Sequence, residues 1–205
     1  RGHVTGVDMT PEMLAKARKN IAAYRSFLAS RNLQVRSPED LRRLIMRSGR
    51  DRAARDALLA KNRASSIALN SSSKIDAMRG VLASNPGHKT IIFTQHNSLV
   101  YRLSRLFLMP AITHSTPKDE RAEVLQRFRE GTYRAIVTSK VLDEGIDVPD
   151  ASLGIILSGT GSKREFVQRL GRILRKVEGK EARLVEIVTR STMETGVSSR
   201  RRGDL

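Results

Sequence analysis

Hydrophobic and polar positions follow different periods in the front and rear parts of the chain. Up to about residue 70, apolar residues recur at helical spacing. The segments Thr10–Glu12 and Ser37–Asp40 each combine a capping hydroxyl, a proline at the first helical position and an acidic first turn, which is typical of a helix start. We therefore predict helices over about 11–28, from 38 onward and over about 51–68, before the polar run 70–73 breaks the pattern.

The rear part alternates short apolar runs with amphipathic segments. A strand followed by a helix, repeated along the chain, is the signature of a parallel sheet with helices on both faces. The pattern predicts an α/β fold with an open, doubly wound, mostly parallel sheet and a helical N-terminal extension. The predicted strands are 90–93, 111–112, 133–137, 153–157 and 184–188, and the predicted helices are 75–82, 97–108, 118–131 (capped by Thr116 and Pro117) and 164–174.

The charge of the chain indicates a polyanionic partner. Its 205 residues include 38 Lys and Arg against 21 Asp and Glu, a net charge of +17, and residues 1–74 alone carry +10. Nucleic acid fits this surplus better than an anionic membrane surface does. No apolar run reaches the roughly 18 residues of a membrane span, and the absence of cysteine excludes a disulfide framework and Cys-ligated zinc. Aromatic residues make up only 4%, so binding should be directed at the nucleic-acid backbone rather than at stacked bases.

Polar segments follow three of the predicted strands, at 94–97, 138–149 and 158–164. In open parallel sheets, ligands bind at the carboxyl ends of the strands, so these segments are the candidate site. One helix later, Gln168, Arg172 and Arg175 are spaced to share one helix face. An amide and two guanidinium groups on one face suit an oxyanion with several oxygens, such as the end of a triphosphate.

Three stretches in this region resemble a known family. In their order and spacing, Ile91–His96, Val141–Pro149 and Gln168–Arg175 resemble the C-terminal RecA-like domain of superfamily 2 helicases. The last two are most similar to XPB-type helicases, in their compact archaeal form, which open duplexes in DNA repair and, in eukaryotes, in transcription initiation. The resemblance covers about residues 24–202. It implies a RecA-like domain over 73–190, preceded by a basic, thumb-like helical extension over 24–72 and followed by a basic tail over 191–205.

The resemblance also implies roles for individual residues at the nucleotide. Arg172 and Arg175 match the arginine fingers that reach ATP bound on a preceding RecA-like domain, and Gln168 matches the residue that senses the γ-phosphate. Gly145 and Asp147 match the motif that contacts the nucleotide and couples it to DNA.

A second group of residues matches the family's contacts to the phosphate backbone of one DNA strand. These are Thr94, His96, Thr138, Ser139 and Lys140. His114, which also follows a predicted strand, is a further candidate for DNA, whereas the four histidines of the chain lack the spacing of metal ligands.

The cofactors implied by the resemblance are ATP and Mg²⁺. The chain contains no Gly-x-x-x-x-Gly-Lys-Ser/Thr phosphate loop, so both are expected mainly on a first RecA-like domain outside this chain. Because the chain begins at Arg1 rather than Met, we expect it to be the second half of a larger motor and inactive alone. The expected partners are DNA, the first domain, and a repair nuclease or a transcription and repair complex, with no membrane. The expected location is the nucleoid in a prokaryote or the nucleus in a eukaryote.

Two alternatives remain open at this point. The chain could be a non-catalytic nucleic-acid-binding module on a helicase-like scaffold, or part of an RNA-directed helicase. The presence of Gln168, Arg172 and Arg175 favours a motor, because a scaffold has no need of them.

The first residues do not match the helicase pattern and form an atypical strand–helix segment over 1–23. Residues 1–22 resemble the second strand and helix of class I methyltransferases, in which the acid matching Asp8 binds the ribose of S-adenosylmethionine. The preceding glycine-rich loop of that family is absent, so we expect no methyltransferase function.

Overall fold

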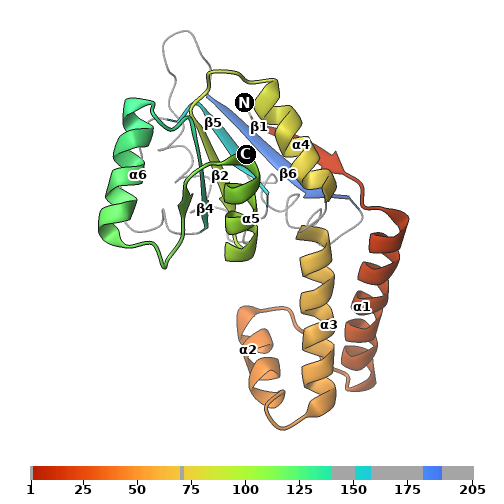
Figure 1. Cartoon of the computed structure of the whole chain (residues 1–205). Coiled ribbons are helices and arrows are strands. Elements are labelled where there is room, and N and C mark those ends of the chain that lie inside the picture. The colour runs from red at the N-terminus through yellow and green to blue at the C-terminus, as the bar shows by residue number, and fades with distance from the viewer. Residues whose placement is uncertain (1, 70–71, 140–150, 158–181, 191–205) are drawn as a thin grey trace. The chain divides into compact units, whose positions relative to one another are not determined.

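The computed structural model describes residues 2–69, 72–139, 151–157 and 182–190. The chain divides into two compact units at residues 8/9 and 71/72. We call residues 9–71 the helical unit, and the described residues among 1–8 and 72–205 the sheet unit (Figure 1).

Within its described residues, the sheet unit contains a six-stranded sheet in which every neighbouring pair is parallel, with the order β1-β6-β5-β2-β4-β3. This arrangement confirms the predicted α/β, doubly wound fold. The strands are β1 (Gly2–Val7), β2 (Thr90–Thr94), β3 (Ala111–Ile112), β4 (Ala135–Ser139), β5 (Leu153–Ile156) and β6 (Arg183–Thr189). The helices that cover the sheet are α4 (Ser72–Ala83), α5 (Asn97–Phe107) and α6 (Lys118–Glu130).

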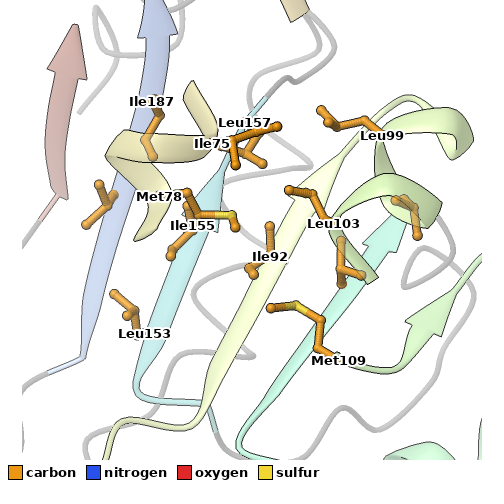
Figure 2. Packing of buried hydrophobic residues seen from close by; sticks show 13 residues of the cluster. Ile75, Met78, Ile92, Leu99, Leu103, Met109, Leu153, Ile155, Leu157 and Ile187 are labelled. Atoms are coloured by element: carbon orange, nitrogen blue, oxygen red, sulfur yellow. The ribbon is translucent and has the colours of Figure 1, made fainter. Parts of the chain in front are cut away.

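The central strands are buried on both faces, which is why they appear in the sequence as continuous apolar runs rather than as alternating ones. Successive residues of β2 point to opposite faces: Ile92 joins the cluster under α4 and α5, whereas Ile91 and Phe93 join the cluster under α6. Figure 2 shows Ile75 and Met78 of α4, with Leu99 and Leu103 of α5, over the strands. Each fully buried side chain of this size contributes about 1.5–3 kcal/mol.

The helical unit consists of α1 (Pro11–Ser30), α2 (Pro38–Arg47) and α3 (Arg52–Leu69). A stripe of small side chains lets α3 pack closely along α1. Its members recur every three or four residues, and each is at most 6% exposed: Ala54, Ala57, Ala60, Ala64 and Ala68. Tyr24 and Leu44 complete one small cluster with the first two of these alanines. The unit therefore has a narrow core, while its basic side chains remain on the surface.

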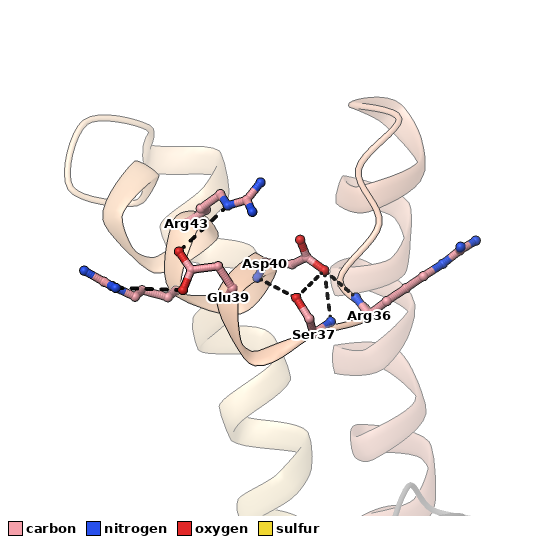
Figure 3. Close-up of polar contacts among 6 residues, drawn as sticks. Arg36, Ser37, Glu39, Asp40 and Arg43 are labelled. Atoms are coloured by element: carbon pink, nitrogen blue, oxygen red, sulfur yellow. Dashed lines mark hydrogen bonds and ion pairs between the residues drawn. The ribbon is translucent and has the colours of Figure 1, made fainter.

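The predicted helix starts at Thr10 and Ser37 are confirmed. Thr10 Oγ1 accepts a hydrogen bond from the Met13 N–H at 3.3 Å. Ser37 and Asp40 form a reciprocal capping box, in which the Asp40 N–H donates to Ser37 Oγ at 3.1 Å and the Ser37 N–H donates to the Asp40 carboxylate at 2.9 Å (Figure 3). The hydrogen bond from the Ser37 side chain, with those from the N–H groups of Arg36 and Ser37, lowers the pKa of Asp40. The stability that the Asp40 carboxylate adds to the cap is therefore fully present at neutral pH and is lost as pH falls through that lowered pKa.

Besides shifts of one or two residues at element ends, the structure corrects three details of the predicted elements. The strand expected over 133–137 runs over 135–139, because the Tyr133 N–H donates to the Arg127 carbonyl and closes the turn after α6 instead of joining the sheet. Ser72 and Ser73 lie in α4 rather than in a break. The N-cap of α6 is Pro117 without a side-chain cap, whereas Thr116 Oγ1 accepts from the Thr113 N–H at 2.9 Å.

Residues 2–7 extend the same sheet. β1 pairs in parallel with β6, from Gly2 opposite Leu184 to Val7 opposite Thr189. Asp8 forms an ion pair with Arg190 at 3.0 Å between Oδ2 and Nη1. The resemblance of residues 1–22 to a methyltransferase is therefore not supported: their strand is an edge strand of this sheet, and the following helix α1 belongs to the helical unit.

The turn after α5 holds a left-handed residue that is not glycine. Leu108 has a φ of 50° and is 92% exposed. The N–H groups of Leu108 and Met109 both donate to the Ser104 carbonyl, so this conformation closes the helix end. A left-handed residue with a side chain costs about 1–2 kcal/mol, and here no burial of the side chain offsets that cost.

We expect Leu108→Gly to raise the free energy of unfolding by about 0.5–1 kcal/mol, because the relief of backbone strain exceeds the added flexibility of glycine in the unfolded chain. Urea unfolding measures this difference. Leu106→Gly is the matched control on the same helix: Leu106 does not have a positive φ, so this change should lower the free energy of unfolding by at least about 1 kcal/mol. A loss of stability in Leu108→Gly would contradict the strain argument.

Candidate nucleic-acid interface

Several of the predicted site residues meet at the carboxyl ends of β2 and β4. The two strands are neighbours, and their parallel register places Thr94 opposite Ser139 and Phe93 opposite Thr138. The loop after β2 then carries His96, whose N–H donates to Thr94 Oγ1 at 3.4 Å. Parallel pairing therefore brings together side chains that are more than 40 residues apart in the sequence.

These residues differ sharply in exposure. Thr94, Thr138 and Ser139 are 3%, 1% and 4% exposed, whereas His96 is exposed. The buried hydroxyls therefore lie beneath the surface of this edge and position its loops, and His96 lies on the surface. The sequence pattern could identify the strand ends but not this difference in burial.

A chain of hydrogen bonds crosses this edge, and its central residue is Asn97, which lies in the predicted polar segment 94–97 but was assigned no role from the sequence. Ser139 Oγ donates to Asn97 Oδ1 at 2.5 Å. The Asn97 Nδ2 lies 3.0 Å from His114 Nδ1. Because Asn97 Oδ1 is the acceptor for Ser139, its Nδ2 is the donor to His114, and the His114 ring carries its proton on Nε2. The exposed His114 ring is thus held at its Nδ1 and presents its Nε2–H as a donor on the surface of this edge.

The loop after β3 is held by its own threonines. The Thr113 N–H donates to Thr116 Oγ1 at 2.9 Å, and the Ser115 N–H donates to Thr113 Oγ1 at 3.3 Å. The Tyr101 hydroxyl of α5 lies 3.2 Å from Thr113 Oγ1. These bonds fix the loop from which His114 extends. We call Thr94, His96, Asn97, His114 and Ser139 together the polar edge.

The polar edge coincides with the start of a helix. α5 begins at Asn97, and its N-cap His96 makes no side-chain capping bond. The N-terminal end of a helix carries partial positive charge and favours anions such as phosphate groups. With the exposed imidazole groups of His96 and His114 beside it, the edge can donate hydrogen bonds to an anionic backbone.

The predicted nucleotide residues lie outside the described part of the chain. These are Gly145, Asp147, Gln168, Arg172 and Arg175, and the same holds for Lys140 of the predicted DNA set. By chain order, Lys140 follows Ser139 at the end of β4, and residues 158–175 follow Leu157 at the end of β5.

Two findings concern other kinds of site. Over the described ranges, no cluster of three or more His, Asp or Glu residues could hold a metal ion. The helices in the same ranges include none that is long and apolar enough to cross a membrane.

Comparison with known proteins places this fold in one class. The C-terminal part of the Fun30 ATPase domain superimposes with a TM-score of 0.69 at 12% identity, covering 98% of this chain and 89% of that one. The DNA 3'-5' translocase XPB2 of Sulfurisphaera tokodaii is 50% identical over 178 residues, which is 87% of this chain and 40% of the relative. The general transcription and DNA repair factor IIH helicase/translocase subunit XPB/SSL2 of Saccharomyces cerevisiae is 39% identical over 128 residues, which is 58% of this chain and 15% of the relative.

The parallel sheet, its two helical layers and these neighbours define a RecA-like domain of the superfamily 2 helicase class. The helicase conserved C-terminal domain model matches residues 73–177, just over half of the chain, and the chain belongs to that family. Its XPB-named relatives bear out the XPB-type resemblance. The chain spans less than half the length of these curated relatives.

The hydrogen bond between Ser139 and Asn97 gives a direct test of the polar edge. We expect the double-mutant cycle of Ser139→Ala and Asn97→Ala to yield a coupling energy of about 0.5–1.5 kcal/mol in urea unfolding, because each single change removes the same bond.

The control cycle pairs Ser139→Ala with Asn85→Ala. Asn85 bonds to Val81 and Arg183, at the opposite end of the strands. These two changes should be additive within about 0.5 kcal/mol. Additivity in the Ser139 and Asn97 cycle as well would show that the chain of hydrogen bonds makes no contribution.

Proposed function

We propose that this chain is the second motor domain of an ATP-dependent DNA helicase or translocase of XPB type. The observation that carries the proposal is the 50% identity, over 87% of the chain, to a protein named as a DNA 3'-5' translocase. The family match over residues 73–177 and the RecA-like sheet support it. In this proposal, ATP and Mg²⁺ are held mainly by a first RecA-like domain, which the chain itself does not include.

The contribution of the chain to ATP hydrolysis would come from three side chains on the segment after β5. Arg172 and Arg175 reach the ATP of the first domain and stabilise the charge on the transferred phosphoryl group, while Gln168 senses the γ-phosphate. Arginine fingers of this kind contribute about 10³–10⁵ in rate. Gly145 and Asp147 would couple this nucleotide contact to DNA. The spacing of the three side chains, which suits one helix face, supports this assignment.

The DNA backbone would be held at two places. The polar edge, extended by Lys140, offers an exposed imidazole, an amide network and the positive end of α5. The helical unit, which we propose acts as a thumb-like grip, carries fourteen Lys and Arg against five Asp and Glu over residues 9–71. Both features favour phosphates and neither reads a base sequence.

We further propose that the complete protein works on genomic DNA within a repair or transcription complex. A yeast relative carries the name of a subunit of the general transcription and DNA repair factor IIH. In a eukaryote this work would take place in the nucleus, and in a prokaryote at the nucleoid.

The motor assignment predicts a strict division of activity. This chain alone should hydrolyse ATP negligibly, and the joined protein, in which it is expressed with the first RecA-like domain of its own protein, should show DNA-stimulated ATPase activity. We expect Arg172→Ala or Arg175→Ala to lower the kcat of the joined protein by about 10³-fold or more. Wild-type turnover in both variants, with thermal melting unchanged, would disprove the arginine-finger assignment.

The backbone-binding assignment predicts weak, sequence-indifferent DNA affinity that falls steeply with salt, because bound counterions are released. Lys140→Gln should weaken binding to all sequences and reduce the salt slope by about one charge. Fluorescence anisotropy at several salt concentrations measures both quantities.

The matched control is Lys89→Gln. Lys89 lies at the amino end of β2, where its Nζ donates to the Arg129 carbonyl, so this change removes the same charge from the opposite end of the strands. It should leave the affinity nearly unchanged. An equal loss in both variants would mean that net charge, and not the polar edge, binds DNA.

A further inference from the structure

The first turn of α4 contains a charged side chain that is almost completely buried. Lys74 is 1% exposed, and it is one of the largest fully buried side chains among the described residues. Its neighbours on the same helix, Ile75 and Met78, are buried apolar residues of the main core. An apolar side chain would suit this helix position, because burial of an ammonium group is unfavourable unless its N–H groups donate to fixed acceptors. The presence of a lysine therefore requires an explanation beyond packing.

The ammonium group of Lys74 donates to a backbone carbonyl far along the chain. Its Nζ lies 2.7 Å from the Leu157 carbonyl oxygen, across 83 residues of sequence. The same Leu157 donates its N–H to the Phe93 carbonyl at 2.9 Å. Leu157 is itself 1% exposed and lies directly after β5, in the core cluster shown in Figure 2. One residue thus connects the start of α4 with the ends of the two central strands, β5 and β2.

Two functional segments leave the sheet at this point. The chain after Phe93 continues through Thr94 to His96 and enters the polar edge. The chain after Leu157 continues to the segment that carries Gln168, Arg172 and Arg175. Lys74 also lies three residues beyond the end of the helical unit. The contact therefore joins the start of α4 to Leu157, from which the chain continues to the nucleotide segment, and through Leu157 to Phe93, from which it continues to the DNA-contacting loop.

We propose that Lys74 is a positioning residue that couples DNA binding to ATP turnover, by holding the Leu157 peptide group between the loop after β2 and the segment after β5. This inference rests on the proposed motor function. A lysine suits the role because its long stem crosses the apolar layer under α4 and its charge strengthens the bond to a backbone carbonyl. Lys74 touches neither substrate in this scheme, and it acts through the geometry of Leu157.

The test uses Lys74→Met in the joined protein, since methionine keeps most of the volume of the stem but donates no hydrogen bond. We expect the DNA-stimulated kcat to fall at least about tenfold, because small displacements of charge-stabilising groups strongly slow catalysis. The KM for ATP and the DNA dissociation constant should stay within about threefold, since the groups that bind ATP and DNA remain. An unchanged DNA-stimulated kcat would overturn the proposal.

The matched control is Met78→Ala, which removes a fully buried side chain one turn along the same helix and leaves the Lys74 bond in place. It should lower the melting temperature by as much as Lys74→Met or more, while kcat stays near that of the wild type. An equal fall of kcat in both variants would mean that Lys74 acts only through stability and would overturn the proposal. If Lys74→Met does not fold, Lys74→Gln takes its place. The glutamine side chain is uncharged and one bond shorter than that of lysine, so its amide should not reach the Leu157 carbonyl. Failure of both to fold would likewise assign Lys74 to stability alone.

A separate measurement distinguishes this inference from the motor assignment. If the wild-type joined protein shows no DNA-stimulated ATPase activity, the proposed function itself fails. If Arg172→Ala abolishes activity but Lys74→Met does not change it, the motor assignment stands and only the role of Lys74 is lost.

Discussion

The parallel pairing of β2 with both β5 and β4 is the constraint on which the rest of the sheet unit depends. Parallel strands require crossover connections, and each crossover places a helix on one face or the other. The central strands are therefore buried on both sides, and their carboxyl ends collect along one edge. The register then determines which loops lie close together. Thr94, at the end of β2, lies opposite Ser139 at the end of β4, and the Leu157 N–H donates to the Phe93 carbonyl. The position of the candidate site is therefore determined by the strand order, and not by any single side chain.

The features that could be predicted from the sequence are those set by neighbours in the chain. The capping box of Ser37 and Asp40 spans three residues, and the apolar runs of β2 and β5 report burial on both faces directly. The features that were misjudged depend on a hydrogen bond or a strand partner that the apolar pattern does not report. Tyr133 fits the apolar pattern of the strand that follows, but its N–H donates to the Arg127 carbonyl and does not join the sheet. Residues 2–7 form the expected strand, but their place in this sheet depends on pairing with β6, some 180 residues later, which the local sequence does not report.

The same distinction explains the outcome at the candidate interface. The sequence order identified the strand ends, and the resemblance to superfamily 2 helicases implied Thr94, His96, Thr138 and Ser139. Neither gave information on which of these residues lie on the surface. Asn97 resembles an ordinary residue at a helix start, and its two partners, Ser139 and His114, lie 42 and 17 residues away. Its position directly after β2, beside His96, placed it in the predicted polar segment 94–97, but nothing in the sequence gave it a role. Lys74 was missed for a similar reason, because a lysine in an amphipathic helix is normally a solvent-exposed residue.

The helical unit shows the opposite balance between packing and charge. Its acidic side chains mostly pair with arginines three or four residues away, as Glu39 does with Arg42 and Arg43 at 3.8 and 4.0 Å (Figure 3). Exposed pairs of this kind contribute only about 0.3–0.5 kcal/mol each, and the remaining arginines repel one another. A core made largely of alanine adds little apolar burial to oppose that repulsion. A surface with this charge therefore weakens the unit when it is free, and the repulsion is relieved when phosphates approach. The distribution of charge is consequently better explained by a polyanionic ligand than by any requirement of the fold.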